Sequence, residues 1–460
     1  MASSIRLVFL VTLFAALVLA APHKRNLQKR SFKVPRSLAQ RHPRGLNGAS
    51  AMRKVFMKYN FQGHENFKAA EGFIANQKIG TGNGNIGGLK VNAANGTTNG
   101  TGTVAANPEQ NAALFLSPVD IGGQTLNLDF DSGSSDLWVF STDLPPQAIQ
   151  QHSAFDASKS ANFKKMDGAQ FSISYGDGSG AAGTVGTDTV TIGGVKVDNQ
   201  AVELANAVSR SFVEDTNTDG LVGLAFSNLN TVNDGTKKIP QKTFFDNVMG
   251  NLDMPVFTAD LDPDGTGVYE FGKIDATKFE GDMAWIPVNA SSGFWQFDSA
   301  KFSVNGQMTD NPTASKAIAD TGTSLLLVDQ NVAEAYYSQV PGAQLNAQVG
   351  GFIYPCDAQL PEMAVAIGDS YMAKIPGNQI TFATVDQANT TCFGGVQGNM
   401  GAGLQIYGDT MFKAQLVAFN GGNQSLGFGQ KPAQPNPAQP GGGQQPAAAA
   451  SPSPAPARLF

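Results

Sequence analysis

Two segments of this 460-residue chain repeat one short pattern that begins at an aspartate. Asp131-Ser-Gly-Ser-Ser-Asp-Leu-Trp-Val139 matches Asp320-Thr-Gly-Thr-Ser-Leu-Leu-Leu-Val328 at seven of nine positions when Ser and Thr are treated as equivalent. A strand-like run precedes each copy, and two apolar residues and a glycine follow farther along, at 221–223 and 406–408. Because 189 positions separate the two aspartates, we expect each copy to belong to its own half of the fold, with a site between the halves.

Two aspartates at such a junction could perform general acid and base chemistry. Carboxyl groups about 3 Å apart cannot both ionise cheaply, so they share one proton. One group then takes a proton from a water molecule, while the other polarises a carbonyl group that the water attacks. No covalent intermediate with the protein is needed. Asp131 and Asp320 are therefore the candidate catalytic residues.

The residues that follow each aspartate have small polar side chains or none. Glycine lets the backbone turn tightly beneath the carboxylates, where a side chain would crowd the opposite loop. We expect the first hydroxyl of each copy to tie the two loops together and the second to donate to the outer carboxylate oxygen. A single such motif could be an ordinary β-turn, but two in matching contexts indicate a site. The supporting residues are Ser132, Gly133, Ser134, Thr321, Gly322 and Thr323.

The elements that must position these loops are predicted to be mainly strands. The chain has 52 glycines and only 15% charged residues, a composition that favours a β-rich fold with many turns. Apolar and polar residues alternate between glycine-rich turns across a body at about 106–430. The clearest predicted strands are 114–121, 124–130, 136–140, 170–175, 183–193 and 267–272, and the best short helices are 242–249 and 331–340.

The two ends of the chain differ from this body. Residues 1–20 have the pattern of a signal peptide, with an apolar run too short to span a bilayer comfortably. Residues 431–460 are rich in Pro, Ala, Gly and Gln, which predicts a disordered low-complexity tail without the apolar terminus of a lipid-anchor signal. Glycosylation sequons begin at Asn95, Asn99, Asn289, Asn389 and Asn423.

The charge is divided along the chain. Residues 1–100 carry a formal charge of +13, and the remainder carries −19. A basic leader and an acidic body attract each other, so we expect 21–100 to be an inhibitory propeptide and linker, with 79–106 exposed. A nucleic-acid-binding tail is the competing interpretation, but the acidic body would repel phosphate. We expect no nucleic-acid partner.

The two cysteines, Cys356 and Cys392, are expected to form one disulfide in an exported chain. Two separate buried thiols are the alternative. Two cysteines alone cannot make a structural zinc site, and no H-E-x-x-H motif is present. We expect no metal and no organic cofactor.

Five motifs together resemble the pepsin-like aspartic proteases, most closely the secreted fungal type that includes aspergillopepsin and penicillopepsin. They are DFDSGSSDLWVF at 129–140, SISYGDGSGAAG at 172–183, DGLVGLAF at 219–226, IADTGTSLLLV at 318–328 and IYGDTMF at 406–412. The resemblance implies an all-β, bilobal fold with pseudo-twofold related lobes at 106–285 and 290–428. It also implies that Asp131 and Asp320 form the shared-proton pair for which this family is the standard example.

The same resemblance assigns roles around the cleft. Tyr175, Gly176 and Asp177 correspond to the tip of a flap hairpin that closes over substrate, and an acid at 177 is associated with accepting Lys. The alternation and glycines of 171–183 independently predict a hairpin, in which Tyr175 could also be a plain strand aromatic. The remaining correspondences are Trp138, which would support the flap tyrosine, and Phe212 and Leu221, which would line a substrate pocket.

The leader contains a candidate inhibitory segment. Apolar residues of 49–59 have helical spacing. At its end, Lys58 and Tyr59 resemble the Lys-Tyr pair with which such leaders close the cleft, the ammonium lying between the two carboxylates. Lys58 could instead be an ordinary charge on a helix surface. Acid would protonate the body and weaken this contact, which predicts activation and activity at acidic pH.

Two other functions fit a pair of carboxylates. A glycosidase also uses two, and a catalytically inactive peptide-binding protein could retain the same fold. A Ser-His-Asp hydrolase is disfavoured, because His152 is the only histidine after residue 64 and no G-x-S-x-G motif accompanies it. We expect a secreted, extracellular, monomeric endopeptidase that acts on polypeptides, with its own leader as an intramolecular inhibitor and no stable membrane association.

Overall fold

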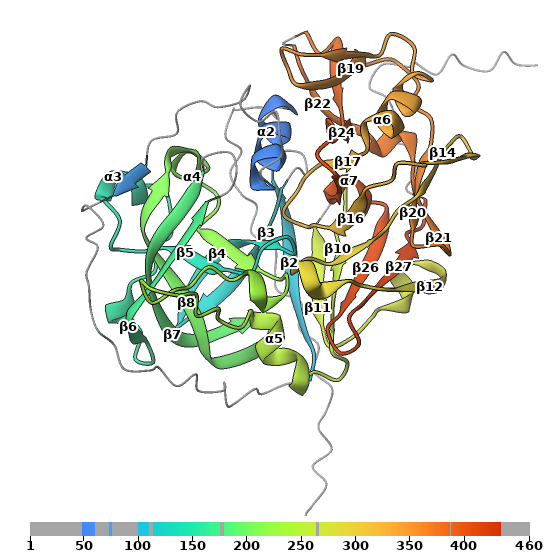
Figure 1. Cartoon of the computed structure of the whole chain (residues 1–460). Helices are drawn as coiled ribbons and strands as arrows, with labels where there is room; N and C mark the ends of the chain where they lie inside the picture. Colours follow the sequence, from blue (N-terminus) through green and yellow to red (C-terminus); the bar gives the residue numbers. More distant parts are fainter. Residues whose placement is uncertain are drawn as a thin grey trace, which may run out of the picture.

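The computed structural model describes residues 48–59, 73–75, 100–109, 114–174, 179–263, 266–386 and 388–433. Strands dominate these residues, and the helices are short. Figure 1 shows two lobes, one built mainly from the first half of the chain and the other from the second half. The fold is all-β and bilobal, as the sequence predicted.

The first aspartate motif lies among three adjoining strands. β4 (Gln124–Asp131) runs parallel to β9 (Gly220–Gly223), and Asp131 is paired with Gly223. β5 (Leu137–Phe140) pairs with the other edge of β9 in the antiparallel direction. The tight turn between β4 and β5 therefore carries Asp131 at the end of a central, buried strand.

The second motif lies in the same arrangement in the other lobe. β16 (Lys316–Ala319) runs parallel to β25 (Leu404–Tyr407), and β17 (Leu326–Val328) pairs antiparallel with the same strand. Asp320 follows β16 directly, as the turn to β17 begins. The internal repeat of the sequence thus corresponds to two equivalent groups of three strands.

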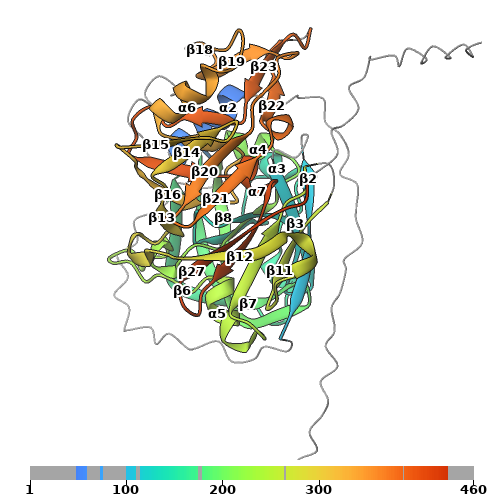
Figure 2. The ribbon, with the colours of Figure 1, turned by 90° about the vertical axis from the view of Figure 1, so that its right-hand side faces the viewer.

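One sheet continues from the first half of the chain into the second. Its order at this junction is β12 (Glu280–Pro287), β27 (Ser425–Gln430), β26 (Gln415–Asn420), β10 (Val256–Asp260), β11 (Gly267–Phe271) and β2 (Gly102–Glu109). β10 and β26 pair with Phe257 opposite Phe419, and the two rings stack with centroids 4.4 Å apart. The lobes therefore share backbone hydrogen bonds and an aromatic core (Figures 1 and 2).

β2 corrects one expectation from the sequence. Residues 79–106 have a linker-like composition, yet β2 begins at Gly102 and its residues 102–106 are buried. The reason is the Thr-Val-Ala-Ala run at 103–106, whose small and β-branched side chains fit a buried strand paired with β11. The body therefore starts before residue 106.

The remaining strands complete each lobe. In the first half they are β3 (Leu114–Ile121), β6 (Lys164–Ser174), β7 (Gly180–Ile192) and β8 (Val195–Ser209). In the second half they are β13 (Gln296–Asp298), β14 (Lys301–Val304), β15 (Gln307–Asp310), β18 (Gln344–Asn346), β19 (Gly351–Pro355), β20 (Met363–Ile367), β21 (Tyr371–Ile375), β22 (Thr381–Thr384), β23 (Thr391–Gly394) and β24 (Val396–Gly398).

One helix lies in the leader, and the others are short segments between strands; the last of them is wholly buried. They are α2 (Gly48–Lys58), α3 (Pro146–Ile149), α4 (Arg210–Glu214), α5 (Phe244–Val248), α6 (Gln330–Tyr337) and α7 (Asp409–Phe412). No helix in the described ranges has the length and apolar character needed to cross a bilayer. The leader also contributes β1 (Phe73–Ala75), which pairs antiparallel with residues 207–209 of β8. No pattern in the sequence predicted this pairing.

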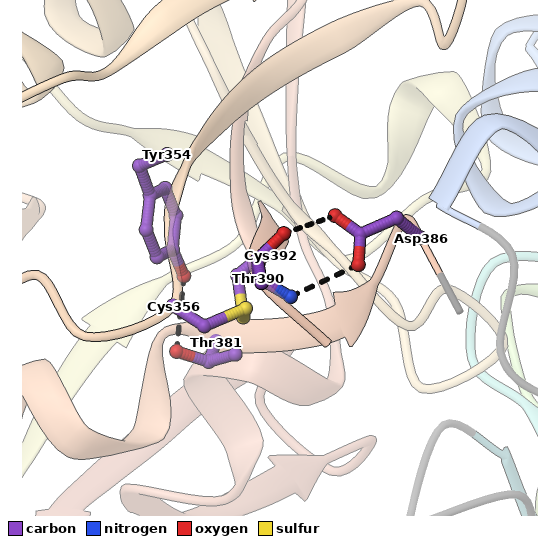
Figure 3. Close-up of a disulfide and its surroundings, with 6 residues drawn as sticks. All are labelled: Tyr354, Cys356, Thr381, Asp386, Thr390 and Cys392. Carbon is purple, nitrogen blue, oxygen red and sulfur yellow. Dashed lines mark hydrogen bonds between the residues drawn. A yellow bond between two sulfur atoms is a disulfide. The ribbon is translucent and has the colours of Figure 1, made fainter. Parts of the chain in front are cut away.

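The expected disulfide joins Cys356, just after β19, to Cys392 on β23. Figure 3 shows it between two hydrogen-bonded groups: Tyr354 donates its hydroxyl to Thr381 at 3.0 Å, and Asp386 accepts from the backbone and hydroxyl of Thr390, each at 2.9 Å. The bridge therefore fastens a sheet at the outer end of the second lobe.

Replacing both cysteines by serine should lower the free energy of unfolding by about 3 kcal/mol. The bridge spans 36 positions, and opening a loop of this size restores entropy to the unfolded chain worth about 3–4 kcal/mol. Urea denaturation followed by far-UV circular dichroism would measure the change. An unaltered unfolding curve in the double variant would contradict a stabilising role for the bridge.

Candidate active site

The structure brings Asp131 and Asp320 together from the two lobes. Each sits where a buried parallel strand ends, and their side chains are 1% and 0% exposed. One ammonium group, that of Lys58, hydrogen-bonds to both carboxylates. Two acids from opposite halves of the sequence therefore face one small volume at the lobe junction.

Reciprocal hydrogen bonds join the two aspartate loops. The backbone N–H of Ser132 donates to the Thr321 hydroxyl at 3.0 Å, and the N–H of Thr321 donates to the Ser132 hydroxyl at 2.9 Å. Each hydroxyl then donates to a carbonyl across the junction, Ser132 to Ala319 at 2.9 Å and Thr321 to Phe130 at 2.6 Å. These buried contacts fix the separation of the two loops.

Each carboxylate is also held by its own loop. Asp131 accepts from the backbone N–H of Gly133 at 2.8 Å and from the Ser134 hydroxyl at 2.7 Å. On the other side, Asp320 accepts from the N–H of Gly322 at 3.0 Å and from the Thr323 hydroxyl. The supporting residues thus lie where the sequence repeat predicted them.

The two glycines are required by the closeness of the loops. A Cβ atom at Gly133 would overlap the carboxylate of Asp320, and one at Gly322 would overlap the carboxylate of Asp131. Any side chain at either position would push the opposite aspartate away. The symmetric glycines therefore permit the approach of the two acids.

The leader fills the space in front of the pair. Lys58, at the end of α2, lies with its Nζ 2.7 Å from Asp131 Oδ1 and 2.9 and 3.0 Å from the two oxygens of Asp320. The hydroxyl of Tyr59 donates to Asp320 Oδ2 at 2.7 Å. Figure 1 shows α2 between the two lobes.

The apolar face of α2 determines how the helix is seated. Met52, Val55 and Phe56 are buried, and they belong to one hydrophobic cluster with residues of the second lobe. The partners are Ile318, Leu325, Leu327, Ile353, Phe393 and Ile406. Helical spacing places these leader residues on one face, so packing that face directs Lys58 at the aspartates.

The surroundings shift the pKa values of the two acids in opposite directions. Burial raises the pKa of Asp131; Lys58 opposes this effect, and the charge of Asp320 adds to it. Burial also pushes the pKa of Asp320 upward, but the Lys58 ammonium and the hydrogen bonds from Thr323 and Tyr59 outweigh it, so this pKa lies below its ordinary value. These opposite shifts favour the proton on Asp131 and the negative charge on Asp320.

A pocket opens beside the aspartates, and both residues expected to line it do so. Phe212 and Leu221 share it with Asp131 and Lys58. Trp138 is fully buried and packs edge-to-face against Phe212, with ring centroids 4.9 Å apart. The predicted flap tip, Tyr175, Gly176 and Asp177, lies outside the described residues; the hairpin strands β6 and β7 that lead to it are present.

Sequence reasoning missed several charged residues around this pocket. Asp129 and Lys54 line it, as does Asp215. Asp129 could have been found because positions 129 and 131 of one strand share a face. Similarly, Lys54 lies four positions before Lys58, on the same face of α2. Asp409 is a further buried acid behind the site, and its position directly after the repeated glycine motif was the available signal.

Comparison with known proteins decides the family. Residues 115–431 match the family model for eukaryotic aspartyl proteases. The chain belongs to this family. Penicillopepsin-1 from Penicillium rubens is 49% identical over 321 residues, which cover 70% of this chain and 79% of that protein. Aspergillopepsin-1 from Aspergillus flavus is also 49% identical over 321 residues, which cover 70% of this chain and 78% of that protein. An Aspergillus fumigatus protein described as aspergillopepsin A-like is 52% identical over 324 residues, covering 69% and 75%.

This aspartyl protease is therefore an aspartic-type endopeptidase, a hydrolase that acts on polypeptides. Membership of the family argues against the glycosidase interpretation.

Asp129 should make the folded protease less stable as the pH rises from about 4 to about 7. Burial raises the pKa of Asp129 to about 7, against the opposing charges of Lys54 and Lys58. In this pH window only the folded chain holds the proton, so the free energy of unfolding falls with rising pH, by up to about 4 kcal/mol from this group.

Urea unfolding at pH 4 and pH 7 would test this effect. The loss of stability between the two pH values should be smaller in Asp129→Asn than in the wild type. Asp310→Asn is the matched control, because that carboxylate is 80% exposed and pairs only loosely with Lys301 at 3.9 Å. An identical pH dependence in Asp129→Asn and wild type would refute the assignment.

Proposed function

We propose that this aspartyl protease is a secreted zymogen that hydrolyses peptide bonds at acidic pH through Asp131 and Asp320. The observation that supports this most strongly is the single Lys58 ammonium that both carboxylates bind. The ammonium nitrogen marks a position within hydrogen-bond distance of both carboxylates. A residue of the leader occupies that position.

The proposed reaction follows from this geometry. A water molecule at the ammonium position would lie within hydrogen-bond reach of both carboxylates. The ionised carboxylate accepts a proton from the water, and the protonated one donates to the carbonyl oxygen of the scissile peptide bond. Hydrogen bonds from Gly133, Ser134, Gly322 and Thr323 hold the carboxylates in place, so little reorganisation is needed.

Charge and packing support latency at neutral pH. Lys58 is 6% exposed and is paired with both aspartates, so removing α2 would leave two buried carboxylates without their cation. The leader also binds the first lobe, where β1 pairs with β8 through the backbone. The leader therefore blocks the site while it binds both halves of the body.

Acid is the proposed trigger for release. In the leader-bound form the Lys58 ammonium acts to lower the pKa of both Asp131 and Asp320, although burial keeps that of Asp131 raised. A carboxyl group whose pKa is lower in the leader-bound form than in the leader-free form strengthens leader binding at pH values above its leader-free pKa. This contribution is lost as the pH falls through the pKa of the leader-bound form. The leader should therefore bind most weakly at low pH, where its own positive charges also repel one another.

Two features support export. Residues 1–20 have a signal-peptide pattern and lie outside the described residues. The disulfide between Cys356 and Cys392 supports an oxidising compartment. We therefore assign the protein to the extracellular space and expect it to act as a monomer without a cofactor.

Asp131→Asn and Asp320→Asn should each lower kcat for a peptide substrate by about a thousandfold or more, because each removes a group that gives or takes a proton. A pepstatin-sensitive assay at pH 3–5 on acid-activated protein measures this loss. Asp310→Asn, an exposed substitution, is the control. Undiminished cleavage in either aspartate variant would refute the assignment of that residue. A wild type without peptidase activity would instead favour an inactive peptide-binding protein.

Lys58→Ala in the precursor should weaken leader binding by about a hundredfold or more, because it removes one partner of a buried ion pair. The variant should lose its leader at a higher pH than wild type and bind pepstatin without acid treatment. Lys159→Ala, whose side chain is 71% exposed, is the matched control. A Lys58→Ala precursor as latent as wild type at neutral pH would show that Lys58 does not close the site.

A further inference from the structure

One segment supplies most of the first-lobe wall of the substrate pocket. It runs from α4 to the start of β9, and it contributes Phe212, Asp215, Thr218, Gly220 and Leu221. Only residues 210–214 of this wall are helical, and they form little more than one turn. The wall therefore depends on contacts from outside for its position.

His152 provides such contacts through both ring nitrogens. Nδ1 lies 2.9 Å from the carbonyl oxygen of Thr218, and Nε2 lies 3.3 Å from the carbonyl oxygen of Val213. Carbonyl oxygens only accept hydrogen bonds, so both contacts require a hydrogen on the ring nitrogen. A neutral imidazole has one N–H, and an imidazolium has two. Only the protonated ring satisfies both carbonyl groups.

The ring is held in this orientation from its other side. It stacks on Phe140, with centroids 3.9 Å apart and planes 13° from parallel. The backbone nearby is also fixed: the N–H of His152 donates to Ile149 at 3.1 Å, and the N–H of Ser153 donates to the Asp219 carboxylate at 2.7 Å. His152 therefore bridges the segment after β5 to the pocket wall.

The charges around the ring come from three places. Asp219 lies where the wall meets β9; burial raises the pKa of this carboxyl group, and the charge of His152 acts in the opposite direction. Within the wall itself, Arg210 pairs with Glu214 at 4.0 Å, and Asp215 faces the pocket. On the segment after β5 the nearest acid in sequence is Asp156, whose carboxylate pairs with Lys159 at 3.2 Å, and β5 itself presents Phe140 to the ring.

We propose that His152 is a positioning residue whose protonation clamps residues 213–218 as the wall of the pocket that receives a side chain of the peptide substrate. This inference rests on the proposed function. The imidazolium joins both ends of the wall, and the neutral ring leaves a lone pair facing one carbonyl oxygen. Histidine gains its second proton on the acidic side of neutrality. Substrate binding therefore acquires a pH dependence separate from that of the aspartate pair.

The test compares KM and kcat at pH 4.5 and 6.5 for the acid-activated, untagged protein and two variants. His152→Phe keeps a ring on Phe140 but has no N–H, and His152→Arg keeps a planar cation with several donors at both pH values. Gln151→Ala, at the exposed neighbouring position, is the control.

The ratio of KM at pH 6.5 to KM at pH 4.5 should be about five times larger in the wild type than in His152→Arg. A factor of this size is expected for one hydrogen bond. His152→Phe should have a high KM at both pH values, while kcat keeps the pH dependence of the aspartate pair. Equal KM ratios in wild type and both variants would refute the clamp. A wild type that cleaves no peptide at any pH would instead refute the proposed function.

A second measurement covers variants that fail to fold. After removal of the leader, His152 is the only histidine, so its imidazole gives a single set of NMR signals. The backbone amides of Glu214 and Asp219, which follow the two carbonyl groups, should shift with the same pH midpoint as the ring. Amide signals that stay constant while the ring titrates would overturn the proposal.

Discussion

The closeness of two buried carboxyl groups is the constraint on which the rest of the structure depends. Burial disfavours each charge, and the two charges disfavour each other. The fold meets this cost with hydrogen bonds from both loops and with the reciprocal bonds between Ser132 and Thr321. The six strands from β2 to β12 continue one sheet from the first half of the chain into the second, whereas the Asp320 loop belongs to a separate five-stranded sheet. The hydrogen bonds between the two loops therefore fix their separation directly.

A nearly symmetric scaffold produces an asymmetric pair. Both aspartates end a parallel strand and accept from the same kinds of donors. The leader breaks the symmetry, because Lys58 contacts both oxygens of Asp320 but one oxygen of Asp131, and Tyr59 binds Asp320 alone. Two copies of one motif thus reach different protonation behaviour through neighbours that lie outside the repeat.

The sequence predicted the parts of the site whose chemistry is local. The repeated motif placed the aspartates, their glycines and their hydroxyls, and alternation located strands such as β3, β4 and β5. It could not show which distant segments pair. β1 is only three residues long, and its partner is more than 130 positions away. Composition likewise could not show that β2 begins at Gly102, because small residues are suited both to a linker and to a buried strand.

The position of β2 has a mechanical consequence for maturation. This strand lies inside the sheet, paired with β11 on one side and β3 on the other, and it starts at Gly102. A cut ahead of that glycine would give the severed body a new amino terminus already paired with β11. Losing the leader would then expose the aspartates and remove β1 from the edge of β8, but the strands that connect the two lobes would remain paired.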